Sequence, residues 1–175
     1  LQTVNVRLSV EQIAYTLNHA EADVVLVNRE FLPLLASIAP LLTNVKHFVL
    51  IDDEGTSLEA PIEFSAEYEA LLASASPDYD FPDFDENAQA TVFYTTGTTG
   101  LPKGVYFSHR QLVLHTLGVA ANVGGAAGHG RMHREDVYMP MTPMFHVHAW
   151  GFPYIATLLG VKQVYPGKYL PATLL

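Results

Sequence analysis

The sequence predicts an α/β fold in which a mixed, mostly parallel sheet is flanked by helices. Two short apolar runs, at 23–28 and 45–51, stand on either side of a helical stretch at 31–42. Continuous apolar runs of this length are typical of strands that are buried on both faces of a parallel sheet. A strand, a helix and a second strand in this order imply a right-handed crossover within one layered domain.

Two further helices are predicted from the way they begin. Ser9 precedes Gln12 by three residues, and Ser108 precedes Gln111 by the same spacing. This spacing allows a capping box, in which each side chain accepts a hydrogen bond from the backbone N–H of the other residue. The expected elements are helices at 9–21 and 108–123, a loop or helix entry at 143–148, a helix that ends near Gly160, and strands at 90–94, 105–107, 136–141 and 162–165.

Residues 74–89 differ in composition from the rest of the chain. Aspartate and glutamate alternate there with proline and aromatic residues. This mixture predicts an irregular, acidic connector that is exposed to water. A metal site built from these carboxylates is the alternative interpretation.

The overall composition excludes several classes of protein. The 175 residues include 18 acidic and 9 basic side chains, a formal net charge of −9, which argues against a nucleic-acid partner because phosphate backbones bind clustered lysine and arginine. Cysteine is absent, so disulfides and thiolate metal sites are excluded, as is typical of a cytoplasmic protein. No apolar run reaches the roughly 18 residues of a membrane span. The first residue is Leu1 and the sequence stops in an expected helix at 173–175, so we expect a piece of a longer polypeptide.

The densest candidate for a binding site is the loop that follows the strand at 90–94. Residues 95–104 contain four threonines, three glycines and one lysine. Glycines let backbone N–H groups approach a polyphosphate, hydroxyls add hydrogen bonds, and Lys103 adds positive charge. The loop is not a Walker A motif, because Lys103 lies between Pro102 and Gly104 and the chain continues as a strand. A plain hairpin turn with a solvated lysine is the alternative.

Residues 94–105, Tyr-Thr-Thr-Gly-Thr-Thr-Gly-Leu-Pro-Lys-Gly-Val, resemble the signature loop of the adenylate-forming superfamily of acyl-CoA synthetases, luciferases and peptide-synthetase adenylation domains. Thr96 stands where the usual form has serine, and it keeps the hydroxyl. The resemblance implies that Lys103 and the loop N–H groups hold the β- and γ-phosphates of ATP, and that Thr98 contacts Mg²⁺. The implied nucleotide-binding residues are Thr95, Thr96, Gly97, Thr98, Thr99, Gly100 and Lys103.

The second candidate segment is 140–151, Pro-Met-Thr-Pro-Met-Phe-His-Val-His-Ala-Trp-Gly. Taken alone, His146 and His148 could form a metal pair, but two histidines without a third ligand are weak evidence for one, and an isolated histidine is more often a structural residue. The Pro-Met-Phe-His run is similar to a motif of the acyl-CoA and coumarate-CoA ligases, which implies that His146 lies beside the substrate carboxylate and the acyl-adenylate. The continuation resembles fatty acyl-CoA synthetases, which implies that Trp150 gates the acyl tunnel, with Phe152 and Tyr154 as weaker candidates. The resemblance assigns no role to His148.

The resemblance covers nearly the whole chain and implies part of the N-terminal domain of the acyl-adenylate-forming fold, over residues 1–175, without the C-terminal domain. The implied reaction converts a fatty acid, ATP and coenzyme A into acyl-CoA, with Mg²⁺ as cofactor and small molecules as the partners. No Tyr-Gly-x-Thr-Glu motif follows, so we expect this segment alone to be inactive. An aryl-CoA ligase, another adenylate-forming enzyme and a non-catalytic binding module of the same fold are the alternatives. The oligomeric state stays open.

Overall fold

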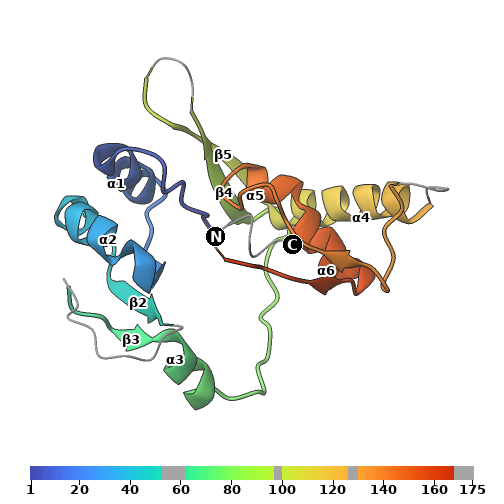
Figure 1. The fold of residues 1–175 in the computed structure, drawn as a ribbon, viewed down its shortest axis with the longest axis horizontal. Helices are drawn as coiled ribbons and strands as arrows, with labels where there is room; N and C mark the ends of the chain where they lie inside the picture. Colours follow the sequence, from blue (N-terminus) through green and yellow to red (C-terminus); the bar gives the residue numbers. More distant parts are fainter. Residues whose placement is uncertain (53–61, 97–99, 126–129, 168–175) are drawn as a thin grey trace. The chain divides into compact units, whose positions relative to one another are not determined.

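The computed structural model describes residues 1–52, 62–96, 100–125 and 130–167 (Figure 1). Gly97, Thr98, Thr99 and the helix expected at 173–175 therefore lie outside the described residues. The chain divides into two compact units. Unit 1 consists of Leu1–Val4, Phe84–Thr96 and Lys103–Leu175, and unit 2 consists of Asn5–Asp83 and Gly97–Pro102.

Unit 2 begins with helix α1 (Val10–His19), and its first turn confirms the predicted capping box. The Gln12 N–H donates to the Ser9 hydroxyl at 3.3 Å, and the Ser9 N–H donates to the Gln12 side-chain oxygen at 3.4 Å. One face of the helix buries Ile13 and Leu17. The cap therefore fixes where the helix starts, and the buried apolar face holds it to the rest of the unit.

Unit 2 contains a parallel sheet of three strands in the order β1-β2-β3, which confirms the parallel arrangement predicted for this region. The predicted helix at 31–42 is broken, because Pro40 has no N–H with which to continue the helical hydrogen bonds. The elements are β1 (Val24–Asn28), the 3₁₀ turn η1 (Arg29–Phe31), α2 (Leu32–Ile38), the 3₁₀ turn η2 (Ala39–Leu41), β2 (His47–Ile51), β3 (Ala66–Glu67) and α3 (Tyr68–Ser74).

The burial of strand β1 differs from the burial that the sequence predicted. Val24 and Leu26 are 47% and 52% exposed, whereas Val27 is buried. Side chains alternate between the two faces of a strand, and α2 packs against β1, so Val24 and Leu26 share the exposed face while Val27 lies on the other. The expectation that this strand is buried on both faces is therefore wrong for these residues.

The centre of unit 1 is an antiparallel hairpin of β4 (Gln89–Thr95) and β5 (Lys103–Ser108). Its register pairs Thr95 with Lys103 and Phe93 with Val105. The first residues of the chain lie along β4, since the Val92 N–H donates to the Leu1 carbonyl at 2.9 Å. The strands predicted at 90–94 and 105–107 are thereby confirmed, and the glycine- and threonine-rich loop joins them.

Helices cover this hairpin. Helix α4 (His109–Gly125) begins at the second predicted capping box, in which the Gln111 N–H donates to the Ser108 hydroxyl at 3.2 Å and the Ser108 N–H donates to the Gln111 side chain at 2.9 Å. Helix α6 (Phe152–Leu159) lies beside α4 (Figure 1). Its C-cap is Gly160, with φ +69°, as the sequence predicted.

Two short parallel strands, β6 (Val137–Tyr138) and β7 (Lys162–Gln163), complete unit 1. They are shorter than the strands predicted at 136–141 and 162–165. Pro140 and Pro166 lack the N–H that a strand ladder requires, so the pairing stops before each of them.

The acidic segment carries no helix or strand from Ala75 to Ala88. Tyr79 and Phe81 are exposed, and the Asp85 carboxylate accepts the Asn87 N–H at 2.8 Å in a local turn. Across the described ranges, no group of three potential ligands is placed to hold a metal ion. Within those same ranges, no helix combines the length and the apolar character needed to cross a membrane.

Candidate active site

One face of the β4–β5 hairpin joins an apolar region to a polar one. Alternation along the strands, together with the register, places Thr91, Phe93 and Thr95 of β4 on the same face as Lys103 and Phe107 of β5. Thr91 and Phe93 are buried, and the rings of Phe93 and Phe107 stack at 5.8 Å. Thr95 and Lys103, at the loop end, are exposed. The same face therefore passes from an aromatic floor to hydroxyl and ammonium groups within a few residues.

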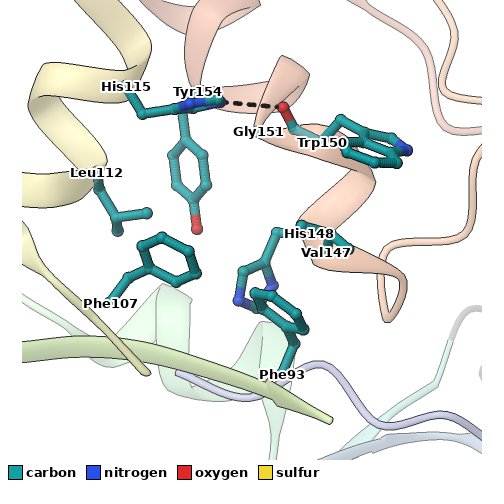
Figure 2. A pocket seen from close by; sticks show the side chains of 9 residues that line it. All are labelled: Phe93, Phe107, Leu112, His115, Val147, His148, Trp150, Gly151 and Tyr154. Atoms are coloured by element: carbon teal, nitrogen blue, oxygen red, sulfur yellow. Dashed lines mark hydrogen bonds between the residues drawn. The ribbon is translucent and has the colours of Figure 1, made fainter. Parts of the chain in front are cut away.

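A small apolar pocket, which we call the aromatic pocket, opens above this floor (Figure 2). It has a volume of about 70 Å³. Tyr154 reaches into it from α6 with its hydroxyl pointing inward (Figure 2), and burial raises the pKa of this phenol, so the hydroxyl stays neutral. The lining residues are Phe93, Phe107, Leu112, His115, Val147, His148, Trp150, Gly151 and Tyr154.

A turn with unusual backbone geometry forms one wall of the aromatic pocket. The segment α5 (Val147–Trp150) has φ values of 50°, 49°, 51° and 59° in sequence order. With ψ near 44° at His148 and 42° at Ala149, this is a left-handed helical turn. The Ala149 N–H donates to the His146 carbonyl at 2.9 Å, and the Gly151 N–H donates to the His148 carbonyl at 3.1 Å.

This left-handed turn contains no glycine. Left-handed geometry costs non-glycine residues about 1–2 kcal/mol each, and it is rarest for β-branched residues such as Val147. Contacts elsewhere must offset that cost, and strained backbone of this kind concentrates at functional sites. The prediction of a loop or helix entry at 143–148 located the segment but not its handedness.

The left-handed turn directs some of its side chains to the interior and Trp150 to the surface. His148 and Ala149 are 4% and 2% exposed, whereas Trp150 is 57% exposed. His146, which precedes the turn, is also exposed, and its ring meets the Trp150 ring edge to face at 5.9 Å. The two side chains singled out from this segment by sequence are thus adjacent, with Trp150 at the edge of the aromatic pocket.

The His148 side chain is held by contacts with other residues of unit 1. Its Nδ1 lies 3.2 Å from the Thr3 hydroxyl and its Nε2 lies 2.6 Å from the Thr91 hydroxyl. The edge of its ring faces Phe93 at 5.4 Å. Burial lowers the pKa of His148 and favours the neutral ring. Both nitrogens are occupied, so the structural interpretation of this histidine holds and the metal pair does not.

A second histidine supports the left-handed turn from the opposite side. His115, on α4, donates from Nε2 to the Trp150 carbonyl at 3.2 Å. The next residue, Gly151, has φ +72°, and a Cβ atom there would lie 2.8 Å from His115 Nε2. Sequence reasoning missed His115, because a single histidine on a helix surface carries no signal. The glycine directly after Trp150 was the available hint.

The signature loop is described at its two ends. The Thr95 hydroxyl donates to the Lys103 carbonyl at 3.4 Å, and the Lys103 side chain is exposed at the start of β5. Thr96 is exposed, and Gly100 has φ +107° with open space where a Cβ atom would lie. The structure therefore brings Thr95 and Lys103 together, while the predicted residues Gly97, Thr98 and Thr99 lie outside the described ranges.

A larger apolar groove lies next to the aromatic pocket within unit 1. Its volume is about 440 Å³, and it shares Leu112 and Tyr154 with the aromatic pocket. Exposed leucine and valine side chains of α4 and α6 form much of its lining. The remaining lining residues are Leu1, Ala90, His109, Val113, Thr116, Leu117 and Leu158. Tyr154 and Leu112 therefore separate the aromatic pocket from the groove.

The fold and the loop agree with a comparison against known families. The profile of the AMP-binding enzyme family matches residues 1–174, and this chain belongs to that family. Solved structures confirm the fold: a Brucella canis acyl-CoA synthetase superposes with a TM-score of 0.72 at 20% identity over 96% of this chain and 28% of its own. An anthranilate CoA ligase in complex with anthranoyl-AMP superposes with a TM-score of 0.70 at 23% identity, over 94% of this chain and 30% of its own.

Curated relatives are CoA ligases. A long-chain-fatty-acid–CoA ligase of Thermus thermophilus is 49% identical over 175 residues, which cover 99% of this chain and 30% of the relative. A 3-methylmercaptopropionyl-CoA ligase of Ruegeria lacuscaerulensis (44%) and a medium-chain-fatty-acid–CoA ligase of Ectopseudomonas oleovorans (43%) each match over 168 residues, 96% of this chain and 30% of the relative. The chain thus spans about 30% of the length of these relatives.

Proposed function

We propose that the protein carrying this chain is an ATP-dependent acyl-CoA synthetase that acts on fatty acids. One observation supports this most directly: a single face of the β4–β5 hairpin carries Phe93 and Phe107 in an apolar pocket and Thr95 and Lys103 at the signature loop. At about 3.4 Å per residue, two residues along β4 separate the pocket floor from the loop by roughly 7 Å. An acyl group in the pocket would then present its carboxylate close to a polyphosphate held by the loop.

The reaction has two balanced steps. A carboxylate oxygen of the fatty acid forms a bond to the α-phosphorus of ATP, and the bond to pyrophosphate breaks. The thiol of coenzyme A then bonds to the acyl carbon, loses its proton, and AMP leaves. Negative charge accumulates on the phosphates in the first step, so positioning and electrostatic stabilisation by Lys103, Thr95 and Thr96 contribute on the phosphate side of the site.

The donor set also fits a magnesium ion. The described end of the loop offers threonine hydroxyls, which are oxygen donors, and Mg²⁺ is commonly held by one or two protein oxygens together with substrate phosphates. The family resemblance of the loop, rather than the described geometry, assigns Thr98 as the protein ligand, since Thr98 lies outside the described residues. When bound, the ion neutralises charge on the phosphates.

His146 and Trp150 are assigned to the acyl side of the site. Their exposed rings form one edge-to-face pair, with Trp150 beside the aromatic pocket. In this arrangement His146 orients the carboxylate or the adenylate oxygen, and Trp150 lines the entrance through which the acyl chain passes. The long-chain and medium-chain fatty acid–CoA ligases among the relatives support an alkyl substrate, as does the apolar groove beyond Tyr154.

A substrate panel tests the proposal. The intact protein carrying this chain is incubated with ATP, Mg²⁺, coenzyme A and hexanoate, dodecanoate, palmitate, cinnamate or anthranilate, and thioester and pyrophosphate are measured. We expect thioesters of the fatty acids and, with Lys103→Ala, a rate lower by about 10²-fold. Lys162→Ala, an exposed lysine on β7, is the control and keeps the rate. Preference for the aromatic acids would support an aryl-CoA ligase, and binding without turnover would support a non-catalytic module.

A further inference from the structure

We propose that His148 is a positioning residue, which holds the left-handed turn in place so that His146 and Trp150 stand together beside the aromatic pocket. The kinetic test of this inference rests on the proposed function. The positioning role itself concerns only residues of unit 1. It assigns a role to the one histidine of this segment for which the family resemblance offers none.

The anchoring runs from the left-handed turn to strand β4 and to the N-terminal segment beside it. Thr91 lies on β4, and Thr3 lies in the segment that follows Leu1 along β4. The Thr3 hydroxyl also donates to the Met144 carbonyl at 2.9 Å, just before the turn begins. His148 therefore ties the middle of the turn to β4, and Thr3 ties its approach to the same place.

Both ring nitrogens of His148 face a threonine hydroxyl. The Thr3 hydroxyl donates to the Met144 carbonyl, and the Thr91 hydroxyl donates to the Leu1 carbonyl at 2.8 Å. The neutral ring carries one N–H, which donates to one of the two hydroxyl oxygens, and the tautomer decides which. In either tautomer the ring lies within hydrogen-bond distance of both hydroxyl groups, so His148 bridges Thr3 and Thr91.

The same contacts explain why the turn keeps its strained conformation. A left-handed turn without glycine persists only where surrounding contacts over-determine it. His148 holds its centre from β4, and His115 holds its end through the Trp150 carbonyl from α4. If the central anchor were lost, the backbone would be free to leave the left-handed region, and His146 and Trp150 would no longer project on the same side.

A matched pair of substitutions isolates this role in the intact protein. Thr91→Val keeps the shape of the side chain but removes the hydroxyl, whereas Thr91→Ser keeps the hydroxyl. We expect Thr91→Val to lower kcat/KM for the fatty acid by about tenfold while KM for ATP changes by less than about twofold, because the residues assigned to phosphate lie elsewhere. Thr91→Ser is expected to restore kcat/KM, and His148→Leu to reproduce the loss.

A fluorescence measurement tests the geometry without turnover. Trp150 is the single tryptophan of this chain, and its ring contacts His146. The Trp150 signal is obtained as the difference between each variant and the same variant with Trp150→Phe. We expect the Trp150 emission of Thr91→Val and His148→Leu to differ from the parent, and that of Thr91→Ser to match it.

The outcomes separate the two proposals. Parental kinetics and Trp150 emission in folded Thr91→Val and His148→Leu would overturn the positioning role. Equal losses for Thr91→Ser and Thr91→Val, or equal losses in the KM for ATP and for fatty acid, would also overturn it. If the parent forms no acyl-CoA, the proposed function fails, and the emission comparison still decides the role of His148.

Discussion

Lys103 and Thr95 pair directly across the antiparallel ladder, and the Thr95 hydroxyl donates to the Lys103 carbonyl at 3.4 Å. This pair closes the end of the hairpin whose other residues form the floor of the aromatic pocket. The two strands therefore carry both halves of the proposed site.

Removing the His146 ring is expected to slow the reaction more than to weaken binding. If the ring stabilises developing charge at the carboxylate or adenylate, His146→Ala lowers kcat in the intact protein by about 10²-fold. Steady-state kinetics of thioester formation measure this. His19→Ala, an exposed histidine at the end of α1, is the control and keeps kcat. A His146→Ala enzyme with parental kcat would remove His146 from the site.

Tyr154 is expected to limit the length of the acyl chain. It separates the aromatic pocket of about 70 Å³ from the groove of about 440 Å³. Tyr154→Ala joins the two spaces, so kcat/KM for palmitate relative to hexanoate should rise by about tenfold, whereas Tyr154→Phe, which keeps the ring, should leave the ratio unchanged. Competition between the two acids gives the ratio directly. An unchanged ratio in folded Tyr154→Ala would show that the chain follows another route.

Gly151 is expected to be required for two separable reasons. Gly151→Ala places a Cβ atom 2.8 Å from His115 Nε2 at a residue with φ +72°. Gly160→Ala, at φ +69° with open space around it, measures the backbone cost alone. We expect about 1–2 kcal/mol of lost unfolding free energy for Gly160→Ala and more for Gly151→Ala.

Gly151→Ala should lose more unfolding free energy than Gly160→Ala. This extra loss should disappear when His115→Ala is added, because the new Cβ atom then no longer meets the imidazole ring. Denaturant unfolding of the single and double variants forms a double-mutant cycle that isolates this coupling. Additive effects would mean that the imidazole moves aside freely, and that His115 does not hold the end of the turn.

His148 is expected to make stability fall in mild acid. Burial lowers its pKa in the folded protein, so below the ordinary histidine pKa, about 6.5, the unfolded chain binds more protons than the folded one. Stability contributed by the neutral ring is therefore complete above about pH 6.5 and is lost as pH falls towards the lower pKa of the folded state. Unfolding midpoints of the parent and of His148→Gln should converge as pH decreases. Parallel curves would contradict the depressed pKa.

The 175-residue chain on its own is expected to form no acyl-CoA. It spans about 30% of the length of its CoA ligase relatives, and the sequence contains no counterpart of the Tyr-Gly-x-Thr-Glu motif expected for an acidic magnesium ligand. Purified chain incubated with ATP, Mg²⁺, coenzyme A and dodecanoate tests this, with the intact protein as positive control. Thioester above the no-enzyme background would contradict it.

Local signals in the sequence predicted much of the fold. Both capping boxes are present, because Ser9 and Ser108 reach backbone donors only three residues away. Gly160 ends helix α6 for an equally local reason, because glycine readily adopts the left-handed conformation of this C-cap. The family of the chain followed from the loop at 94–105, whose residues are contiguous.

What could not be predicted depends on contacts between distant residues. Nothing in the run Val147–Trp150 favours left-handed backbone, and its partners Thr3, Thr91 and His115 are 35 to 145 positions away in sequence. The exposure of one face of β1 could likewise not be predicted, because an apolar run does not show which of its faces a helix covers. His146 and Trp150 were singled out by resemblance, whereas their edge-to-face contact required the handedness of the turn.

Ala149 shows how narrowly the left-handed turn restricts its own composition. Glycine would adopt this backbone without steric penalty, yet Ala149 is 2% exposed, and its methyl group fills buried space that glycine would leave empty. A larger side chain would have to displace the atoms that bury Ala149. At this position the backbone conformation favours glycine and the buried space favours a methyl group, so alanine is a compromise between two opposing requirements.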